Sequence, residues 1–191
     1  MPKTCSDFLS SIIPTFEDVT AKCPIRPESL RFVSIRNPKD FSGAVIHHSG
    51  VMRADKPEAI ANWLFNKYGW PMSYHFVIPM SADAVYQSKS LDIRSPQCGN
   101  KNGNLNMIAI CMEGNWVNTH PQDSQMELLW DLLKGLELWR GESFGIVAHK
   151  SISKTACPGT VVEALSVFTH PSRVKSHERQ GKIATNIMKK L

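Results

Sequence analysis

The order of apolar segments along the chain is the feature that most restricts its fold. Short runs rich in β-branched residues alternate with stretches in which apolar residues recur at helical spacing. Strands are expected at 43–48, 74–78, 84–86, 106–112 and 144–148. Helices are expected near 6–13, from Pro57 to Gly69, from a capping box at Ser124 and Glu127 through Trp139, and near 160–168. This interleaving predicts an α/β fold, a single domain with a central mixed β-sheet flanked by helices.

The chain of 191 residues has the length of one domain with short additions. Residues 1–42 are interrupted by Pro14, Pro24, Pro27 and Pro38 and are expected to form an N-terminal extension packed on the domain. Residues 43–170 are predicted to form the main domain, and residues 171–191 a basic C-terminal tail. The tail holds six basic residues and one acid, whereas residues 1–170 hold 16 of each. Its apolar residues share one helical stripe, so it either packs as a last helix or contacts an anionic envelope weakly.

Composition excludes several classes of protein. A neutral body leaves no basic face for nucleic acid, so no nucleic-acid partner is expected. No apolar run is long enough to span a membrane, and the N-terminus is a poor signal peptide. We expect a soluble protein made in a cytoplasm. Five scattered cysteines without a C-x-x-C pair indicate reduced thiols rather than a disulfide framework. Separately, the protein is expected to be a monomer.

Three residues form a pattern with chemical meaning. His47 and His149 each lie at the end of a predicted strand, and Cys157 follows His149 after seven residues. Two imidazoles and a thiolate are good ligands for Zn²⁺, and three protein ligands leave a fourth position open. The alternative is that both histidines are ordinary satisfied polar groups and that the cysteine is simply buried.

Four segments carry a resemblance to a known family: AVIHHSG (44–50), MSYHFVI (72–78), NMIAICMEGNW (106–116) and AHKSISKTACPG (148–159). In order and spacing they resemble the zinc N-acetylmuramoyl-L-alanine amidases, in the type 2 amidase domain shared by phage lysozymes and peptidoglycan-recognition proteins. The resemblance covers about residues 43–168. It implies that His47, His149 and Cys157 bind Zn²⁺ and that bacterial peptidoglycan is the substrate.

The resemblance also implies roles for residues beyond the metal ligands. Tyr74 matches the tyrosine that stabilises the reacting carbonyl, a role that suits a neutral phenol. Thr155 matches a position whose side chain assists catalysis in the family. Lys154 lies one residue away from that position, and its simplest interpretation is a solvated charge in a loop. Further substrate contacts are expected from a small set of polar side chains: His48, Arg94, Asn106 and Lys154.

Two departures from the family pattern stand out. Cys111 lies where another branch has a glutamate as general base, and Glu113, two residues on, is either a base or a turn residue. The stretch 93–100 lacks the histidine that many relatives have near the cleft. Arg94, Gln97 or Asn100 is expected to replace that substrate contact.

The function that follows from the resemblance is hydrolysis of the amide bond between N-acetylmuramic acid and L-alanine, by a water that zinc activates. A phage endolysin, made without a signal peptide and acting on the cell wall, is the favoured role. Four alternatives stay open: a non-catalytic peptidoglycan-binding module, a cytoplasmic amidase that recycles muropeptides, a thiol hydrolase that uses Cys157 with His149, and a regulatory role through protein–protein contacts without catalysis.

Overall fold

A computed structural model describes residues 4–52 and 56–168, with side chains as far as residue 165. The strands are β1 (Phe16–Asp18), β2 (Gly43–His48), β3 (Phe76–Ile78), β4 (Val85–Gln87), β5 (Met107–Met112) and β6 (Gly145–Ala148). The helices are α1 (Cys5–Ile12), α2 (Pro57–Tyr68), α3 (Lys101–Asn106), α4 (Asp123–Arg140), α5 (His149–Ile152) and α6 (Val161–Phe168), with short 3₁₀ helices η1 (Thr20–Lys22) and η2 (Pro27–Phe32). The predicted α/β class is confirmed. The basic tail lies outside the described residues.

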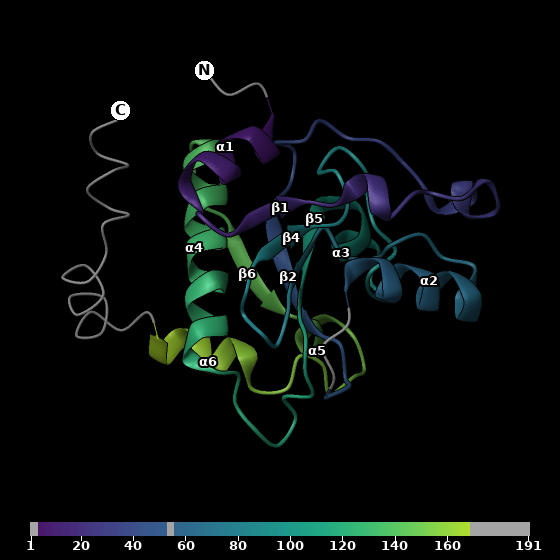
Figure 1. Ribbon diagram of the computed structural model, residues 1–191. Coiled ribbons are helices and arrows are strands. Elements are labelled where there is room, and N and C mark those ends of the chain that lie inside the picture. The colour runs from purple at the N-terminus through teal and green to yellow at the C-terminus, as the bar shows by residue number, and fades with distance from the viewer. Residues whose placement is uncertain (1–3, 53–55, 169–191) are drawn as a thin grey trace.

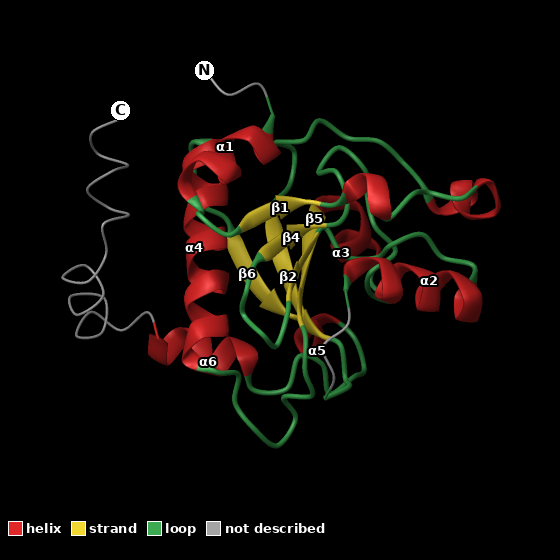
Figure 2. Cartoon of the chain, in the orientation of Figure 1, coloured by secondary structure: helices red, strands yellow, loops and turns green. Residues whose placement is uncertain are grey.

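The six strands form one mixed sheet in the order β1-β4-β3-β5-β2-β6 (Figure 2). All neighbouring pairs are parallel except β3 and β4, which are antiparallel. In the centre, Gly43 to His48 of β2 pair with Met107 to Met112 of β5, and β6 runs along the other side of β2. The carboxyl ends of β2, β5 and β6 therefore meet at one edge of the sheet.

Helices cover both faces of the sheet, which explains why the central strands are apolar throughout. Helices α1, α4 and α6 pack on one face, around buried residues such as Leu9, Ile46 and Leu132. Helix α2 lies on the other side (Figure 1), where Leu64 packs with Val77 and Cys111. Among the described residues, no helix combines the length and apolar character that crossing a membrane requires.

Local sequence signals explain where the helices begin and end. Pro57 occupies the first turn of α2, and Gly69 ends that helix in a left-handed conformation with φ of 67°. The capping box expected at Ser124 is wrong, because α4 begins one residue earlier and its cap residue, Gln122, makes no side-chain capping bond. A capping box forms instead at α1, between Thr4 and Asp7.

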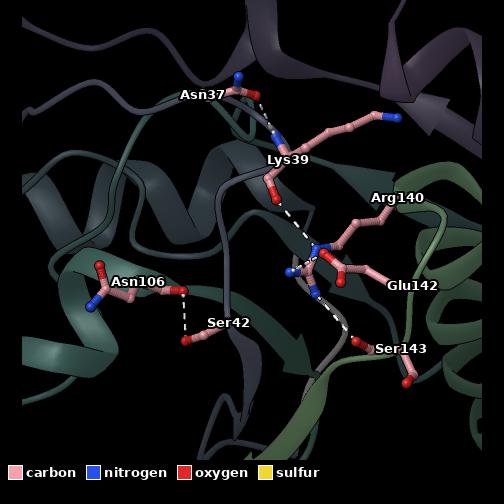
Figure 3. A network of polar contacts seen from close by, with 7 residues as sticks. All are labelled: Asn37, Lys39, Ser42, Asn106, Arg140, Glu142 and Ser143. Atoms are coloured by element: carbon pink, nitrogen blue, oxygen red, sulfur yellow. Dashed lines mark hydrogen bonds and ion pairs between the residues drawn. The ribbon is translucent and has the colours of Figure 1, made fainter.

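The edge of the sheet where β2 begins is held by contacts between distant segments (Figure 3). The Arg140 side chain donates to the Lys39 and Ser143 carbonyls and lies 2.8 Å from a carboxylate oxygen of Glu142. These contacts join the end of α4 to the segment that precedes β2. They help to fix the strand whose other end carries His47.

Candidate metal centre

His47 is the most deeply buried of the predicted ligands. It lies near the end of β2, where both neighbouring strands are parallel, and only 1% of its surface is exposed. Its ring centroid lies 4.5 Å from that of His149 and 5.3 Å from that of Tyr74. The strand pairing therefore brings together three side chains that are widely separated in the sequence.

His149 and Cys157 come from the segment that follows β6. Ala148 pairs with Ile46 in register, so His149 begins α5 directly beside the end of β2. The loop after α5 then returns, and the Lys150 N–H donates to the Cys157 carbonyl at 2.6 Å. The Lys150 ammonium also donates to the Gly159 carbonyl, which fastens the end of this loop.

The structure brings the three predicted ligands into one cluster. One ligand atom from each of His47, His149 and Cys157 lies within 4.8 Å of the others. The Cys157 Sγ lies 3.9 Å from the His47 Nδ1 and accepts a hydrogen bond from the His48 N–H at 3.2 Å. The His149 Nδ1 is buried and has no hydrogen-bond partner. A buried nitrogen without a partner, beside a thiol and a second imidazole, fits a bound metal ion such as Zn²⁺.

Burial controls the protonation of this cluster. It lowers the pKa of His47 to about 3, with a smaller contribution from the neighbouring His149. Burial likewise lowers the pKa of His149 and raises that of Cys157 to about 11. Both imidazoles are therefore neutral near pH 7, with a lone pair on each ring, and a metal ion bound here would displace the thiol proton.

Tyr74 lies next to the cluster, just before β3. It is half-buried, and it lines a pocket together with Ser49, which follows β2, and with residues of α2 that include Ile60 and Trp63. Burial raises the pKa of Tyr74 well above its usual range, with the nearby cysteines adding to the effect. The phenol is thus a neutral hydrogen-bond donor at physiological pH, on a residue that lines this pocket and lies beside the candidate cluster.

The other predicted site residues have mixed positions. Thr155 is exposed, and its hydroxyl accepts a hydrogen bond from the Cys157 N–H at 3.2 Å. His48 is tied to the fold, because its Nδ1 accepts a hydrogen bond from the Trp116 N–H. Among the described residues, no hydrogen bond or ring contact joins Arg94 or Lys154 to the three candidate ligands.

Asn106 and Asn100 are not brought to the cluster. Asn106 precedes β5 by one residue, five positions before Cys111, the register partner of His47. Its carbonyl accepts from Ser42 (Figure 3) and its amide donates to Asn102. Asn100 caps α3 by accepting from the Gly103 N–H. The strand direction explains this placement of Asn106, because the start and the end of β5 lie at opposite edges of the sheet.

The remaining candidates also have structural partners. The Glu113 side chain is fully buried and accepts a hydrogen bond from the Met80 N–H, on the β3 side of β5 and away from β2. Cys111 is buried among apolar side chains. Gln97, expected to face substrate, instead lies behind His47, with Oε1 3.1 Å from the His47 Nε2. Its place in a loop rich in polar residues gave no signal of this contact.

Comparisons with known proteins agree with this geometry. The sequence profile of the family described as N-acetylmuramoyl-L-alanine amidase matches residues 37–160. This range contains all three residues of the cluster and Tyr74. Comparison with curated protein sequences finds no match.

Several solved structures share the fold. The N-acetylmuramoyl-L-alanine amidase LysC from Clostridium intestinale URNW is 22% identical with a TM-score of 0.59, covering 70% of this chain and 88% of its own. The Ph2119 endolysin from the Thermus scotoductus MAT2119 bacteriophage Ph2119 is 21% identical with a TM-score of 0.61, covering 70% and 86%. Drosophila peptidoglycan recognition protein SD is 23% identical with a TM-score of 0.60, covering 72% and 84%. At these identities the likeness establishes the fold.

Proposed function

Because the chain belongs to the N-acetylmuramoyl-L-alanine amidase family, we propose that it hydrolyses the amide bond between N-acetylmuramic acid and L-alanine with Zn²⁺ held by His47, His149 and Cys157. The observation that carries the proposal is the cluster itself, whose ligand atoms lie within 4.8 Å of one another. The family accounts for the amidase activity and the peptidoglycan substrate. The metal dependence and the roles of individual residues are the proposed part.

In this proposal the site residues have separate roles in the reaction. A Zn²⁺ ion held by the cluster would supply a Lewis acid and a source of hydroxide near neutral pH. Tyr74 keeps its proton because burial raises its pKa, and it donates a hydrogen bond from its hydroxyl to the scissile carbonyl oxygen as negative charge develops there. Thr155, exposed beside Cys157, orients the substrate or the attacking water through its hydroxyl. The pocket between Tyr74 and Trp63 of α2 receives the substrate.

The direct test is digestion of purified cell walls, with mass spectrometry of the released fragments and metal analysis of the protein. We expect free stem peptides that begin with L-alanine, one zinc per chain, and loss of activity on chelation that zinc restores. Cys157→Ala should lose the metal and the activity together. Tyr74→Phe should keep the metal and lose about 10²- to 10³-fold in kcat, the usual effect of removing one donor to an oxyanion. Broken glycan strands with intact stems would contradict the proposal.

The same measurements separate this enzyme from two alternatives. A peptidoglycan-binding module would bind walls but release no peptide. A thiol hydrolase would stay active after chelation, and iodoacetamide would inactivate it at Cys157.

We further propose that the enzyme acts as an endolysin on the assembled wall. In support, a bacteriophage endolysin is among the solved structures with this fold. An endolysin should cleave intact walls at least as fast as soluble muropeptides. A strong preference for soluble muropeptides would assign the enzyme to muropeptide recycling instead.

A further inference from the structure

Gln97 is a buried side chain whose amide orientation is determined by its surroundings. Its Nε2 donates to the carbonyl oxygens of Gly103 at 2.8 Å and Met107 at 3.0 Å. A carbonyl oxygen can only accept, so both amide hydrogens must point to these two groups. The Oε1 therefore faces the His47 Nε2, which lies 3.1 Å away.

This orientation determines which nitrogen of His47 carries the proton. The Gln97 Oε1 can only accept, so the His47 Nε2 must be the protonated nitrogen and donate to it. The Nδ1 then keeps its lone pair, on the side of the ring that lies 3.9 Å from the Cys157 Sγ. We propose that Gln97 is a positioning residue that holds His47 in the Nε2–H tautomer and so prepares Nδ1 as a metal ligand. The inference rests on the metal site of the proposed function.

The loop around Gln97 is built to keep this amide in place. The Asn104 Oδ1 accepts hydrogen bonds from the N–H groups of both Gln97 and Cys98. At Gly103, which supplies one of the two carbonyls, an added Cβ would lie only 2.6 Å from the Cys98 Sγ, so the backbone there is closely packed. A rigid partner for the second nitrogen of a ligand histidine keeps the ring oriented as well as protonated on the correct side.

A direct contact with substrate does not account for Gln97. Only 7% of its surface is exposed, and both polar atoms of its side chain already have partners within the fold. Its effect on the reaction must therefore pass through His47.

Gln125 offers a matched control on the far side of β5. It is fully buried, and its Nε2 also donates to two carbonyls, those of Ile78 and Glu113. Its Oε1 has no hydrogen-bond partner, so it orients no imidazole. Gln97→Met and Gln125→Met thus keep a side chain of similar length and each remove two donated hydrogen bonds, but only the first removes the acceptor for His47.

The test measures the His47 tautomer and zinc affinity. Nitrogen-15 NMR of the metal-free protein should show a proton on the His47 Nε2 in the wild type and in Gln125→Met, and a mixture of tautomers in Gln97→Met. Zinc affinity, measured by competition with a chromophoric chelator, should fall about 10- to 100-fold in Gln97→Met and stay unchanged in Gln125→Met. Gln97→Glu, which keeps an acceptor oxygen, should retain the Nε2–H tautomer.

The outcomes separate this inference from the proposed function. A proton on Nδ1 in the metal-free wild type would overturn the role of Gln97, and this measurement needs no variant. Equal zinc affinity for Gln97→Met and the wild type would overturn it as well. A wild type with the Nε2–H tautomer that binds no zinc would instead refute the metal site, while the contact between Gln97 and His47 would stand.

Discussion

Burial sets the protonation state of the polar side chains around β2 and β3. It lowers the pKa of the His47 and His75 imidazoles and raises the pKa of Cys157 and Tyr74. Each of these groups is therefore neutral near pH 7 without a metal. The three candidate ligands are therefore uncharged without a metal, which avoids the cost of burying a charge without a partner.

Lys89 is a residue for which burial is costly, and its removal gives a prediction on stability. Only 3% of its surface is exposed, and its ammonium donates to the Ser95 hydroxyl. Burial, with a smaller effect from Arg36, lowers its pKa to about 7. Between pH 7 and about 10 the unfolded lysine keeps a proton that the folded one has lost. The contribution of Lys89 to the free energy of unfolding therefore increases as the pH rises.

Lys89→Met should remove this gain. From pH 7 to pH 9 the wild type should gain about 2 kcal/mol relative to the variant, since each unit of pKa shift corresponds to about 1.4 kcal/mol. Urea unfolding at several pH values measures the difference. Lys134→Met, at an exposed lysine of α4, should follow the wild-type profile. Parallel profiles for the wild type and Lys89→Met would contradict the lowered pKa of Lys89.

Among the elements, the loop that carries Cys157 depends on a close approach to Trp116. Gly159 has φ of 70°, and an added Cβ would collide with the Trp116 carbonyl. The Thr160 N–H donates to that same carbonyl. The loop between α5 and α6 is therefore placed by backbone contacts, which require a glycine at this position.

Gly159→Ala should both destabilise the protein and weaken its metal site. Gly141, which ends α4, also has a positive φ of 89° but has open space where a Cβ would lie. Gly141→Ala should therefore cost only about 1 kcal/mol of unfolding free energy, from backbone strain. Gly159→Ala should cost about 3 kcal/mol or more and lower zinc affinity, because the loop must move. Equal losses of stability and unchanged zinc affinity in the two variants would contradict this account of the loop.

Periodicity predicted the elements that bury an extended apolar face. The run GAVIHH became β2 at the expected residues, and Pro57 and Gly69 marked the bounds of α2. The short β1 (Phe16–Asp18) was missed because it has only three residues and is defined by pairing with β4. Helix α3 (Lys101–Asn106) was missed because its polar sequence has no apolar stripe, and packing against β5 supports it.

For the molecule as a whole, the order of the strands decides which predicted site residues meet. Placing β2 between β5 and β6 brings His47 beside His149, and the returning loop adds Cys157. Residue type and spacing suggested this cluster but left open that the three residues are ordinary buried groups, and the resemblance to a known family favoured the metal site. These signals could not identify Gln97 as the partner of His47, because that contact depends on how a loop folds back over the sheet. Nor could residue type and spacing show that Asn106 lies away from the cluster, because its position follows from the direction of β5.

A metal ion held by this cluster joins segments that are about a hundred residues apart, so it should stabilise the whole fold. The ligands come from β2, from the start of α5 and from the loop before α6, and the unfolded chain does not hold them together. Binding to the native state alone adds about 2.7 kcal/mol to the free energy of unfolding when free zinc is 100-fold above its dissociation constant. Thermal and urea unfolding, with zinc or with a chelator, should show this shift. Cys157→Ala should abolish it, whereas Cys5→Ala, which removes a buried thiol from α1, should preserve it. A shift that survives in Cys157→Ala would place the stabilising ion elsewhere.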